Sequence, residues 1–372
     1  MVSTKVRSQS DLCCTLNGSG SPGTGGCVAS SGSPGARNLN VKLSIVILCW
    51  NDLKVIGDCL KSIFATTRRT ELEVIVSDNG STDGSIEFIR REFPQVRLIQ
   101  NSVNLRFAKG NNVGIQASHG EYVLILNPDT IIHDGTLDGL VDYADEHAEA
   151  GAFGCRVLYS DGSFQPCIRP LPSVRSEWCM ALHLNVLARL SDWFHPGIYV
   201  GWTGDKERTV GWLAGCFILV RGELLKRLGG FDERFFYYYE DTDLCQRIWN
   251  AGAKILYTPH VSITHLGGQS TTKRYPPIGF ALDGQITRYL YFYKYYGGRG
   301  ARQCRWAKLV ALFLRRLGYA LIQLVNPSEE GKNRQELLRA LFAWNYRVDP
   351  VRLVEKGEEP ELNIDADRVT ER

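Results

Sequence analysis

The sequence predicts an α/β protein built on one mostly parallel β-sheet with helices on both faces. Between residues 41 and 130, four apolar, β-branched runs alternate with stretches of helical spacing, which is typical of parallel sheets. Each apolar run also stops at a cluster of polar residues. Ligands of such sheets bind beyond the carboxyl ends of the strands, so we expect one crevice to collect these clusters.

The elements follow in order from Val41. The predicted strands are apolar runs that stop at polar or turn residues, at 41–51, 72–77, 96–101 and 121–127. The predicted helices between them carry apolar residues three and four positions apart, at 55–67, at 85–93, and in a third helix that starts at Asn111 and Asn112. A further buried strand is expected in residues 212–220.

The composition describes a globular chain of 372 residues, 44% apolar and 22% charged. A net charge of +3 over this length argues against a dedicated nucleic-acid binder. The eleven cysteines are odd in number and include no C-x-x-C pair. We therefore expect reduced thiols in a cytoplasmic protein, with neither a disulfide framework nor a zinc site.

Composition divides the chain into four parts. Residues 1–40 are rich in Gly and Ser, hold Asp11 as their only acid and lack an apolar signal region, so we expect a disordered tail; a transit peptide or a start codon placed too early are the alternatives. Residues 41–272 form the expected α/β domain. Residues 273–345 are expected to be helical, and residues 346–372 to be an acidic, flexible tail.

A run of aromatic residues leads directly into Glu240, Asp241 and Asp243. Three carboxylates within four residues repel one another, and the aromatic side chains lower the local dielectric constant. A cation, a proton or a substrate hydroxyl is therefore expected to share the site. The alternative is a solvated helix N-terminus, where acids favour the helix dipole.

Two other polar clusters fit a nucleotide. Asp78 could accept a hydrogen bond from a nucleobase imide, and Gly80 allows the backbone to turn close to a flat ring; an ordinary Asx turn is the alternative. Lys109, the N–H groups around Gly110 and a helix N-terminus make a candidate phosphate cradle. This stretch matches neither the P-loop nor the dinucleotide-fold pattern.

The remaining candidates lie further along the chain. Asp129 follows a strand and could hold a divalent cation that bridges a diphosphate, or could simply end the strand in a turn. In residues 151–210 we expect a hairpin, a Pro-rich loop and an amphipathic insertion that packs on the domain; contact with the acceptor or with a membrane are the alternatives. Trp212 could stack on a sugar or belong to the core, and Gly215 follows it.

Taken together, these stretches resemble one known family. The runs SIVILCWN, VIVSDNGSTDGS, NLRFAKGNNVG, GEYVLILNPDT, WLAGCFILVRGELLKRLGGFDERFFYYYEDTDLCQR and ITHLGGQST resemble, in this order, the motif series of the family 2 inverting glycosyltransferases, above all the rhamnosyltransferase-like branch. The resemblance covers residues 43–272. It implies the GT-A fold, a single Rossmann-like nucleotide-sugar-binding unit with an acceptor-binding half, followed here by a C-terminal helical extension.

The resemblance implies roles for single residues. It makes Asn51 and Asp78 nucleotide contacts and places Asp129 as the second acid of the D-x-D metal motif, with Asn127 at the first position. It makes His265 a later ligand of a divalent metal (Mg²⁺ or Mn²⁺) or of the diphosphate; without these neighbours, a surface or core histidine would be the alternative. With the clusters above, the candidate substrate-binding residues are Asn51, Asp78, Asn79, Gly80, Asn104, Arg106, Lys109, Asn112, Asn127, Trp212 and Gly215.

The implied mechanism is a single, inverting transfer. Asp241 is the base that takes the proton of the acceptor hydroxyl as it attacks the anomeric carbon, with Glu240 beside it, while Asp243 remains an ordinary first-turn residue. The Q-x-x-R-W motif of processive relatives is absent. Relatives usually carry Gly where this chain has Arg106. Either the backbone there needs no positive φ or the match is weaker at this point, and the arginine could contact the diphosphate or the sugar.

The C-terminal region combines basic and apolar residues. On a helical wheel the basic residues share one side, namely Arg302, Arg305, Lys308, Arg315 and Arg316. An apolar stripe lies on the other side, formed by Trp306, Val310, Phe313, Leu317, Leu321 and Leu324. Because charges interrupt the apolar run, it cannot span a bilayer. The pattern predicts a helix lying on an anionic membrane; a helix that caps the catalytic domain is the alternative.

The resemblance also implies partners. The N-P-D-T variant at residues 127–130 favours dTDP-rhamnose as the nucleotide-sugar donor, with UDP-hexoses as the alternative. The acceptor would be a glycan or polyprenyl-diphosphate-linked glycan of cell-wall or surface-glycan synthesis. The enzyme would be cytoplasmic and peripheral at the inner face of the plasma membrane.

Two rival classes lack support in the sequence. A sugar nucleotidyltransferase needs a Gly-rich basic loop after the first strand, and CWNDLKVIG does not provide one. A non-catalytic sugar-binding protein has no use for Asp129, Glu240, Asp241 and His265 together.

Overall fold

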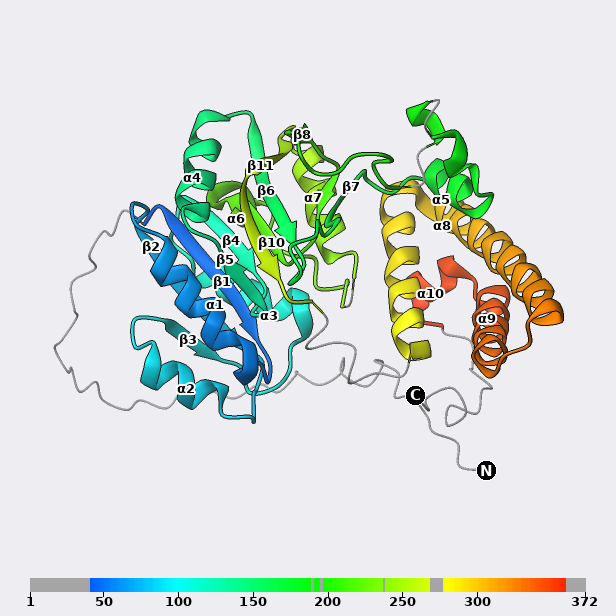
Figure 1. Cartoon of the computed structure of the whole chain (residues 1–372), viewed down its shortest axis with the longest axis horizontal. Helices are drawn as coiled ribbons and strands as arrows, with labels where there is room; N and C mark the ends of the chain where they lie inside the picture. The colour runs from blue at the N-terminus through cyan, green and yellow to red at the C-terminus, as the bar shows by residue number, and fades with distance from the viewer. Residues whose placement is uncertain (1–40, 189–190, 195–196, 237, 268–276, 359–372) are drawn as a thin grey trace, which may run out of the picture.

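The computed structural model describes residues 41–358 except 189–190, 195–196, 237 and 268–276. Within this part of the chain, an α/β body with one large sheet lies beside a group of C-terminal helices (Figure 1). The predicted α/β class is confirmed. The expectations for residues 1–40 and 359–372 fall outside the described residues.

The large sheet has nine strands, in the order β3-β2-β1-β4-β10-β6-β11-β5 with β8 beside β11. Strands β1 to β4 are parallel, as the alternation of strands and helices predicts. Strand β10 runs antiparallel to β4 and β6, and β5 antiparallel to β11. The strands are β1 (Leu43–Cys49), β2 (Leu72–Asp78), β3 (Arg97–Gln100), β4 (Tyr122–Leu126), β5 (Thr130–Ile132), β6 (Ala150–Leu158), β8 (Arg208–Thr209), β10 (Phe217–Arg221) and β11 (Lys254–His265).

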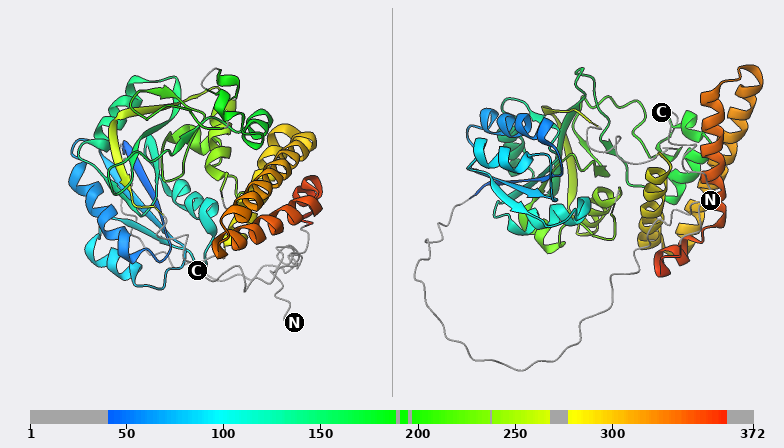
Figure 2. Two further views of the ribbon diagram at one scale, coloured as in Figure 1. Left: turned by 45° about the vertical axis from the view of Figure 1, so that its right-hand side comes forward. Right: turned by 90° about the horizontal axis from the view of Figure 1, so that it is seen from below.

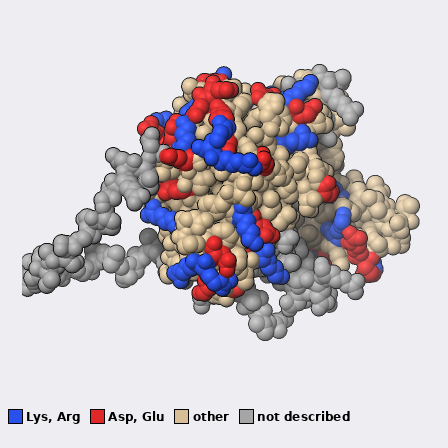
Figure 3. Space-filling model, turned by 60° about the vertical axis from the view of Figure 1, so that its left-hand side comes forward, with Lys and Arg blue, Asp and Glu red and all other residues tan. Residues whose placement is uncertain are grey.

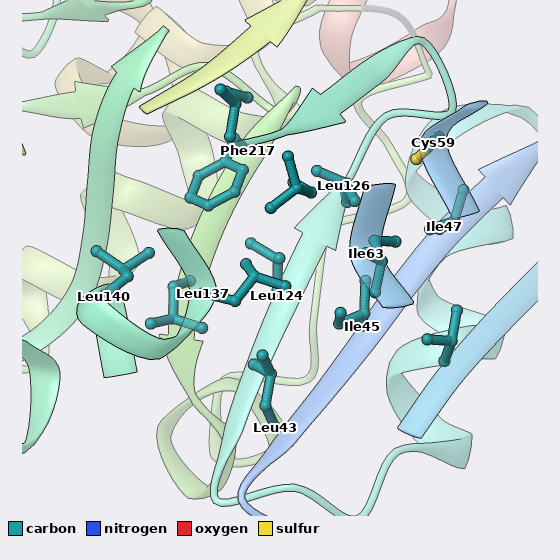
Figure 4. Packing of buried hydrophobic residues seen from close by; sticks show 14 of the residues in the cluster. Leu43, Ile45, Ile47, Cys59, Ile63, Leu124, Leu126, Leu137, Leu140 and Phe217 are labelled. Carbon is teal, nitrogen blue, oxygen red and sulfur yellow. The ribbon is translucent and has the colours of Figure 1, made fainter. Parts of the chain in front are cut away.

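Helices cover both faces of the sheet, because successive side chains of a strand point to opposite faces. Leu43, Ile45 and Ile47 of β1 pack into one core cluster with helices α1, α2 and α4 (Figure 4), whereas Val46 joins a second cluster with α3, α6 and α7. These helices are α1 (Leu53–Thr66), α2 (Ser85–Glu92), α3 (Arg106–Ala117), α4 (Thr136–Glu146), α6 (Gly222–Arg227) and α7 (Glu240–Asn250).

Helix α3 lies unusually close to β1. A Cβ atom at Gly110 would overlap the side chain of Leu48, and one at Gly114 would overlap Val46. Only glycine fits at these two positions, so the two residues set the depth at which α3 sits on the sheet. This packing holds the N-terminal end of α3 beside the carboxyl ends of β1 and β2.

The buried strand predicted at residues 212–220 is divided in two. β9 (Trp212–Leu213) pairs with β7 (Ile168–Arg169) in a separate two-stranded sheet, and β10 enters the main sheet. Gly215 and Cys216 lie in the break between β9 and β10. The break matters for the site, because it presents backbone groups of these residues beside the carboxyl end of β4.

Residues 151–158 belong to β6 of the main sheet, and a helix later in the insertion packs on the C-terminal helices. Helix α5 (Val174–Ala181) starts at Ser173, whose side chain accepts a hydrogen bond from the Ser176 N–H. Trp178 Nε1 donates to Gln303 Oε1 at 3.0 Å, which ties α5 to helix α8. The expected packing role is confirmed for this part of the insertion, while Trp193 stays 54% exposed.

Three helices form the C-terminal group, which stands beside the α/β body (Figure 2). α8 (Pro277–Val325) is interrupted at Gly297, where φ is 66° and ψ is −174°. It packs with α9 (Glu329–Arg347) and α10 (Pro350–Lys356) around a third core cluster. Asp349 caps α10 by accepting from the Val351 N–H. The expectation of a flexible tail beginning at residue 346 is therefore wrong for this segment.

The two sides of α8 differ from the prediction. The apolar stripe is exposed, by about half or more at Trp306, Phe313, Leu317, Leu321 and Leu324. The basic side partly faces the protein: Arg305 donates to the carbonyl oxygens of Asn345 and Tyr346 near the end of α9, where helix carbonyls lack partners, and Arg316 lies over the Phe342 ring. These two basic side chains therefore contact α9.

Two further sequence expectations concern the surface and the thiols. Basic and acidic side chains are intermixed on the face seen in Figure 3, in line with the small net charge. The cysteines of the described residues are free. Along the described chain, none of the helices combines the length and apolar character needed to cross a membrane.

Candidate active site

Helix α7 carries the acidic cluster in its first turn. Glu240, Asp241 and Asp243 all lie there, where carboxylates interact favourably with the helix dipole. Tyr238 and Tyr239, which precede the helix, have φ values of 62° and 66°. This left-handed conformation is costly for aromatic residues. The chain thus makes a strained turn directly before Asp241.

Asp241 accepts three hydrogen bonds from nearby groups. The Gly215 N–H donates to Oδ2 at 3.0 Å, and Thr242 donates to Oδ1 from its N–H at 2.6 Å and from its hydroxyl at 3.2 Å. These donors favour the ionised carboxylate, while burial favours the neutral acid. Burial outweighs them and raises the pKa of Asp241 above its usual value.

Glu240 lies in a drier environment than Asp241. The residue is 7% exposed, and within the described part of the chain its Oε2 has no hydrogen-bond partner. Burial and the neighbouring charge of Asp241 raise the pKa of Glu240 well above its usual value. Of the two, Glu240 is therefore the residue expected to hold a proton, and Asp241 the one expected to ionise first and to serve as a base.

Replacing Glu240 by Gln keeps a neutral side chain of the same shape. The unfolded chain ionises Glu240 above about pH 4.5, whereas the raised pKa in the folded protein keeps the proton on Glu240 to a higher pH. The wild type therefore loses stability relative to Glu240→Gln as pH rises from there toward the raised folded-state pKa. Thermal unfolding between about pH 5 and pH 9 should show a melting-temperature advantage of the variant that grows with pH.

The same variant tests the proton assignment through activity. At neutral pH, transfer by Glu240→Gln should stay within about tenfold of the wild-type rate, because a neutral side chain replaces a neutral one. A loss as large as that of Asp241→Asn would show that Glu240 works in its charged form.

Backbone groups of two neighbouring residues, the Gly215 N–H and the Cys216 carbonyl, connect Asp241 to a second polar group. Gly215 donates to Asp241, and the carbonyl oxygen of Cys216 accepts from the Asn127 N–H at 3.0 Å. Asn127 Nδ2 in turn lies 3.5 Å from His265 Nε2. Adjacent Cα atoms are about 3.8 Å apart, so only a short span separates the two groups.

Asp129 and His265 form this second group, next to paired ends of β5 and β11. His265 Nε2 lies 3.3 Å from Asp129 Oδ1, and both side chains are largely buried. Gln165 Oε1 lies 3.1 Å from His265 Nδ1. Because this oxygen only accepts, it assigns the proton to Nδ1 and leaves the Nε2 lone pair free toward Asp129.

This pair fits a divalent cation whose other ligands come from a substrate. A carboxylate and an imidazole with its second nitrogen held in place are metal ligands. Mg²⁺ is commonly held by one or two protein groups together with substrate phosphates. Within the described residues, no three His, Cys, Asp or Glu side chains are placed to hold a metal. Oxygens of a bound diphosphate would have to complete the coordination shell.

The polar residues after β1 and β2 form hydrogen bonds within and between the loops that follow these strands. Asp78 is 1% exposed, and its carboxylate accepts from the N–H groups of Gly80 and Ser81. This is the Asx turn that the sequence left open as the alternative. Asn51, at a φ of 57°, accepts from the Thr82 N–H at 2.7 Å, and Gly80 has a φ of 77°. Nucleobase contacts of these residues stay a prediction.

Amide side chains join β2 to the start of α3. Asn79 Nδ2 donates to Asn104 Oδ1 at 3.3 Å and to the Arg106 carbonyl at 3.1 Å. Asn104 Oδ1 also accepts from the Arg106 N–H at 2.8 Å. The network fixes the turn that leads into α3. Asn79 and Asn104 therefore have a structural role, and any contact with a substrate would be a second role.

Helix α3 begins at Arg106, and the predicted start at Asn111 and Asn112 is wrong. Asparagines are common helix caps, but these two are buried inside the helix. Asn112 donates to the Phe231 carbonyl and accepts from the Phe231 N–H, so a substrate contact would have to break one of these bonds. Lys109 is exposed in the first turn of α3, so its ammonium group is accessible for the predicted contact with a phosphate.

Gly215 lies beside Asp241, and Trp212 lies three residues before it in β9. Trp212 is partly buried against the second core cluster, with the Arg169 guanidinium 6.0 Å from its ring centre, so both of its predicted roles remain open. A Cβ at Gly215 would stand 3.1 Å from the Phe107 ring and 3.8 Å from Asp241 Cβ. The absence of a side chain at Gly215 therefore leaves the Asp241 carboxylate close to the backbone.

The chain is similar to proteins of one family. Residues 44–178 match the family model described as Glycosyl transferase family 2. An N-acetylglucosaminyl-diphospho-decaprenol L-rhamnosyltransferase of Mycobacterium tuberculosis is 31% identical over 282 residues, which are 69% of this chain and 85% of the relative. The chain belongs to glycosyl transferase family 2.

Two further proteins resemble this family 2 glycosyltransferase. Rhamnosyltransferase WbbL of Escherichia coli is 28% identical over 169 residues, which are 43% of this chain and 60% of the relative. The mannosyltransferase PcManGT of Pyrobaculum calidifontis, solved with GDP-Man and Mn²⁺, is 16% identical with a TM-score of 0.50 over 87% of this chain and 89% of that one. The enzyme has the GT-A fold, as the sequence resemblance implied.

Arg106 of this glycosyltransferase stands where the motif comparison expects Gly. Its φ is 67°, so the position does require the left-handed backbone, and the expectation that it needs no positive φ is wrong. The guanidinium lies 4.8 Å from the Phe236 ring centre. Burial raises the pKa of Asp283 on α8, and the nearby charge of Arg106 opposes that rise. Arg106 thus links α3 to the aromatic stretch before α7 and to α8.

The backbone strain at Arg106 can be measured with two truncations. Arg106→Ala and Arg106→Gly both remove the contact with Phe236, but only Gly adopts the left-handed region without cost. We expect Arg106→Gly to be more stable than Arg106→Ala by about 1 kcal/mol, measured by urea unfolding. Equal stabilities of the two variants would mean that the backbone relaxes when the arginine is removed.

Asp243 has a larger role in the glycosyltransferase than that of the ordinary first-turn residue predicted. Its side chain is fully buried and lies 2.8 Å from Arg247 Nε and 2.5 Å from Lys294 Nζ, and it accepts from the Tyr295 hydroxyl at 2.7 Å. Asp232 lies 2.8 Å from the same Lys294 nitrogen. Two carboxylates and two cations therefore join α7 to α8.

Proposed function

We propose that this glycosyltransferase transfers rhamnose from dTDP-rhamnose to a hydroxyl of a lipid-linked glycan, with inversion at the anomeric carbon. The observation that carries the proposal is the oriented carboxylate of Asp241, which the backbone of Gly215 and Cys216 connects to Asn127, next to the Asp129–His265 pair. A base next to a diphosphate site is what a one-step displacement requires. The two rhamnosyltransferase relatives support the choice of sugar. A UDP-hexose donor is the alternative.

Asp241 takes the proton of the attacking hydroxyl. Its hydrogen bonds to Gly215 and Thr242 hold both carboxylate oxygens in place, so the base is oriented before the acceptor arrives. The raised pKa of Asp241 makes it a stronger base than an ordinary aspartate. Glu240 stays neutral, so it adds no second charge, and its O–H can donate to an acceptor oxygen.

The donor diphosphate is placed on the other side of the crevice. Asp129 and His265 would hold a divalent metal, and Gln165 would keep the imidazole in its ligating tautomer. When bound, the metal supplies positive charge against the departing nucleoside diphosphate. Lys109 and the N-terminal end of α3 add positive potential from the protein.

Gln165 offers a specific test of the metal site. Replacing it by Leu removes the hydrogen bond that orients His265, and the loss of such a partner typically weakens metal affinity about 10–100-fold. We expect Gln165→Leu to need that much more Mn²⁺ for half-maximal transfer, measured after EDTA treatment, while kcat at saturating metal changes little. Full wild-type activity in EDTA would contradict a metal-dependent mechanism.

The donor is tested by following nucleoside diphosphate release from dTDP-rhamnose, UDP-glucose, UDP-galactose and GDP-mannose. The acceptor is an N-acetylglucosaminyl-diphospho-polyprenol, the class named for the mycobacterial relative. We expect kcat/KM for dTDP-rhamnose to exceed the others by at least about tenfold. Faster turnover of a UDP-hexose would overturn the rhamnose assignment and leave the family assignment intact.

We also propose that the apolar stripe of α8 lies on the inner face of the plasma membrane, where a polyprenyl-linked acceptor is found. Large apolar side chains rarely remain exposed together on a surface that meets only water. Arg302 is exposed on the same helix and supplies a cation for anionic headgroups. The enzyme would then be peripheral and cytoplasmic, with its crevice near the lipid surface.

Flotation with anionic vesicles tests this contact. The double variant Leu317→Glu, Leu321→Glu places two charges in the stripe and should reduce the vesicle-bound fraction at least about tenfold. Val103→Glu is the matched control, because Val103 is also exposed but lies in the α/β body. Unchanged binding of the double variant would favour the alternative, a helix that only caps the catalytic domain.

A further inference from the structure

A small cavity lies between α5 and α8, among residues that take no part in the proposed transfer. Arg288, Lys308 and Arg315 line it from α8, and Glu177 lines it from α5. About 40 Å³ of it is open to water, several times what one water molecule needs. A group the size of a phosphate can therefore enter.

The charges around this cavity are not balanced by the protein. Glu177 forms an ion pair with Arg288, and these two side chains are 5% and 17% exposed. In the described part of the chain, no carboxylate lies within ion-pair distance of Lys308 or Arg315. Three positive charges thus meet one negative charge. Burial, followed by repulsion from Arg288 and Arg315, lowers the pKa of Lys308 to about 8.

A hydrogen-bond donor also remains unused. Arg288 Nε is buried and has no hydrogen-bond partner within the described residues, although buried guanidinium groups are normally fully bonded. Apolar side chains of α5 and α8 form the rest of the wall and offer no strong acceptor, namely Met180, Ala181, Ala307, Ala311 and Leu312. The cavity therefore combines uncompensated positive charge with a free donor.

The missing partner must be a small anion that carries about two negative charges. A carboxylate would leave one positive charge uncompensated, whereas a phosphate or diphosphate group matches the excess. Arginine binds phosphate oxygens through several donors at once, and lysine binds them as a point charge.

We propose that the Arg288–Lys308–Arg315 cavity is a binding site for a phosphate or diphosphate group, separate from the donor crevice. On a helix with about 100° per residue, Lys308 lies opposite Leu317 and thus opposite the apolar stripe. This placement favours a phosphate carried by a soluble ligand, while a lipid phosphate would share the same chemistry.

Calorimetry on the full chain tests the site. Inorganic pyrophosphate is titrated in the presence of saturating dTDP, which occupies the donor crevice. Lys308→Met and Arg315→Gln should each raise the Kd for pyrophosphate at least about tenfold. Arg302→Gln is the matched control, because Arg302 is an exposed arginine of the same helix outside the cavity lining, and its Kd should match the wild type.

The pH dependence gives a second readout. Lys308 loses its charge as pH rises through about 8, so wild-type binding should weaken over that range more than binding by Lys308→Met. A parallel titration with vesicles containing about 30% phosphatidylglycerol distinguishes a lipid source from a soluble one. If Lys308→Met weakens vesicle binding but leaves pyrophosphate binding unchanged, the site is assigned to lipid phosphate. No binding of either probe, or an equal loss in Arg302→Gln, overturns the proposal.

Discussion

Replacing Asp241 by Asn is expected to lower kcat for sugar transfer by about 10³-fold, the usual contribution of a general base. The amide cannot take the proton of the acceptor hydroxyl, but its oxygen can still accept a hydrogen bond from Gly215 or Thr242. Because the substitution leaves the Asp129–His265 pair unchanged, the Kd for dTDP should stay within about threefold of the wild type. Stopped assays of transfer and calorimetry of nucleotide binding measure the two quantities.

The control for this variant is Asp58→Asn, an exposed aspartate of α1, which should transfer at the wild-type rate. Both variants should show a single cooperative melting transition. An Asp241→Asn enzyme with substantial activity would remove Asp241 from the role of base. Loss of nucleotide affinity together with activity would indicate instead that the substitution disturbs the donor site.

Replacing Asp243 by Asn should destabilise the folded enzyme by about 3–5 kcal/mol, the usual cost of removing one partner from a buried ion pair. The carboxylate is fully buried, and its loss leaves Arg247 and Lys294 partly buried with Asp232 as the remaining nearby anion. We expect a lower midpoint of urea unfolding, followed by circular dichroism and tryptophan fluorescence. A loss below about 1 kcal/mol would mean that water reaches these charges.

A double variant separates the charge effect from lost packing. In Asp243→Asn combined with Lys294→Met, one of the unpaired cations is removed as well, so part of the lost stability should return. Asp232→Asn serves as the matched control, because Asp232 also pairs with the exposed Arg234 and its removal should cost less. Additive effects of Asp243→Asn and Lys294→Met would argue against a shared ion-pair network.

The strands of the central sheet follow from the sequence because their apolar runs have one physical explanation. A run such as residues 43–49 can only be buried on both faces. Its end at Asn51 indicates the carboxyl edge of the sheet, where a ligand is expected. The antiparallel insertion of β10 does not follow, because an apolar strand reads the same in either direction. Its orientation depends on the break at Gly215 and on pairing with β4 and β6.

Side-chain roles are predictable only where the partners are close in sequence. Glu240 and Asp241 are adjacent, so their mutual repulsion can be seen in the sequence. Asp243 differs, because its cation Lys294 lies 51 positions away in an aromatic stretch. Gln165 is likewise 100 positions from the His265 that it orients. No pattern in the neighbouring sequence predicts either partner.

Predictions from local sequence preferences were also wrong where a side chain forms a tertiary hydrogen bond instead. Asn111 and Asn112 have the composition of a helix start, but the amide of Asn112 is used to hold the backbone of Phe231. Asp78 could equally have faced a ligand or its own turn, and its observed bonds are those of the turn. These choices are made by the packing of the whole domain.

The ion pairs between α7 and α8 also determine when the enzyme matures during its synthesis. Domains fold from the N-terminus as the chain is made, and the sheet is complete once β11 has been translated to His265. Lys294 and the aromatic partners of Phe235 in the third core cluster follow only later. A nascent chain therefore has its sheet before it has Lys294, the counterion of the buried Asp243 in the first turn of α7.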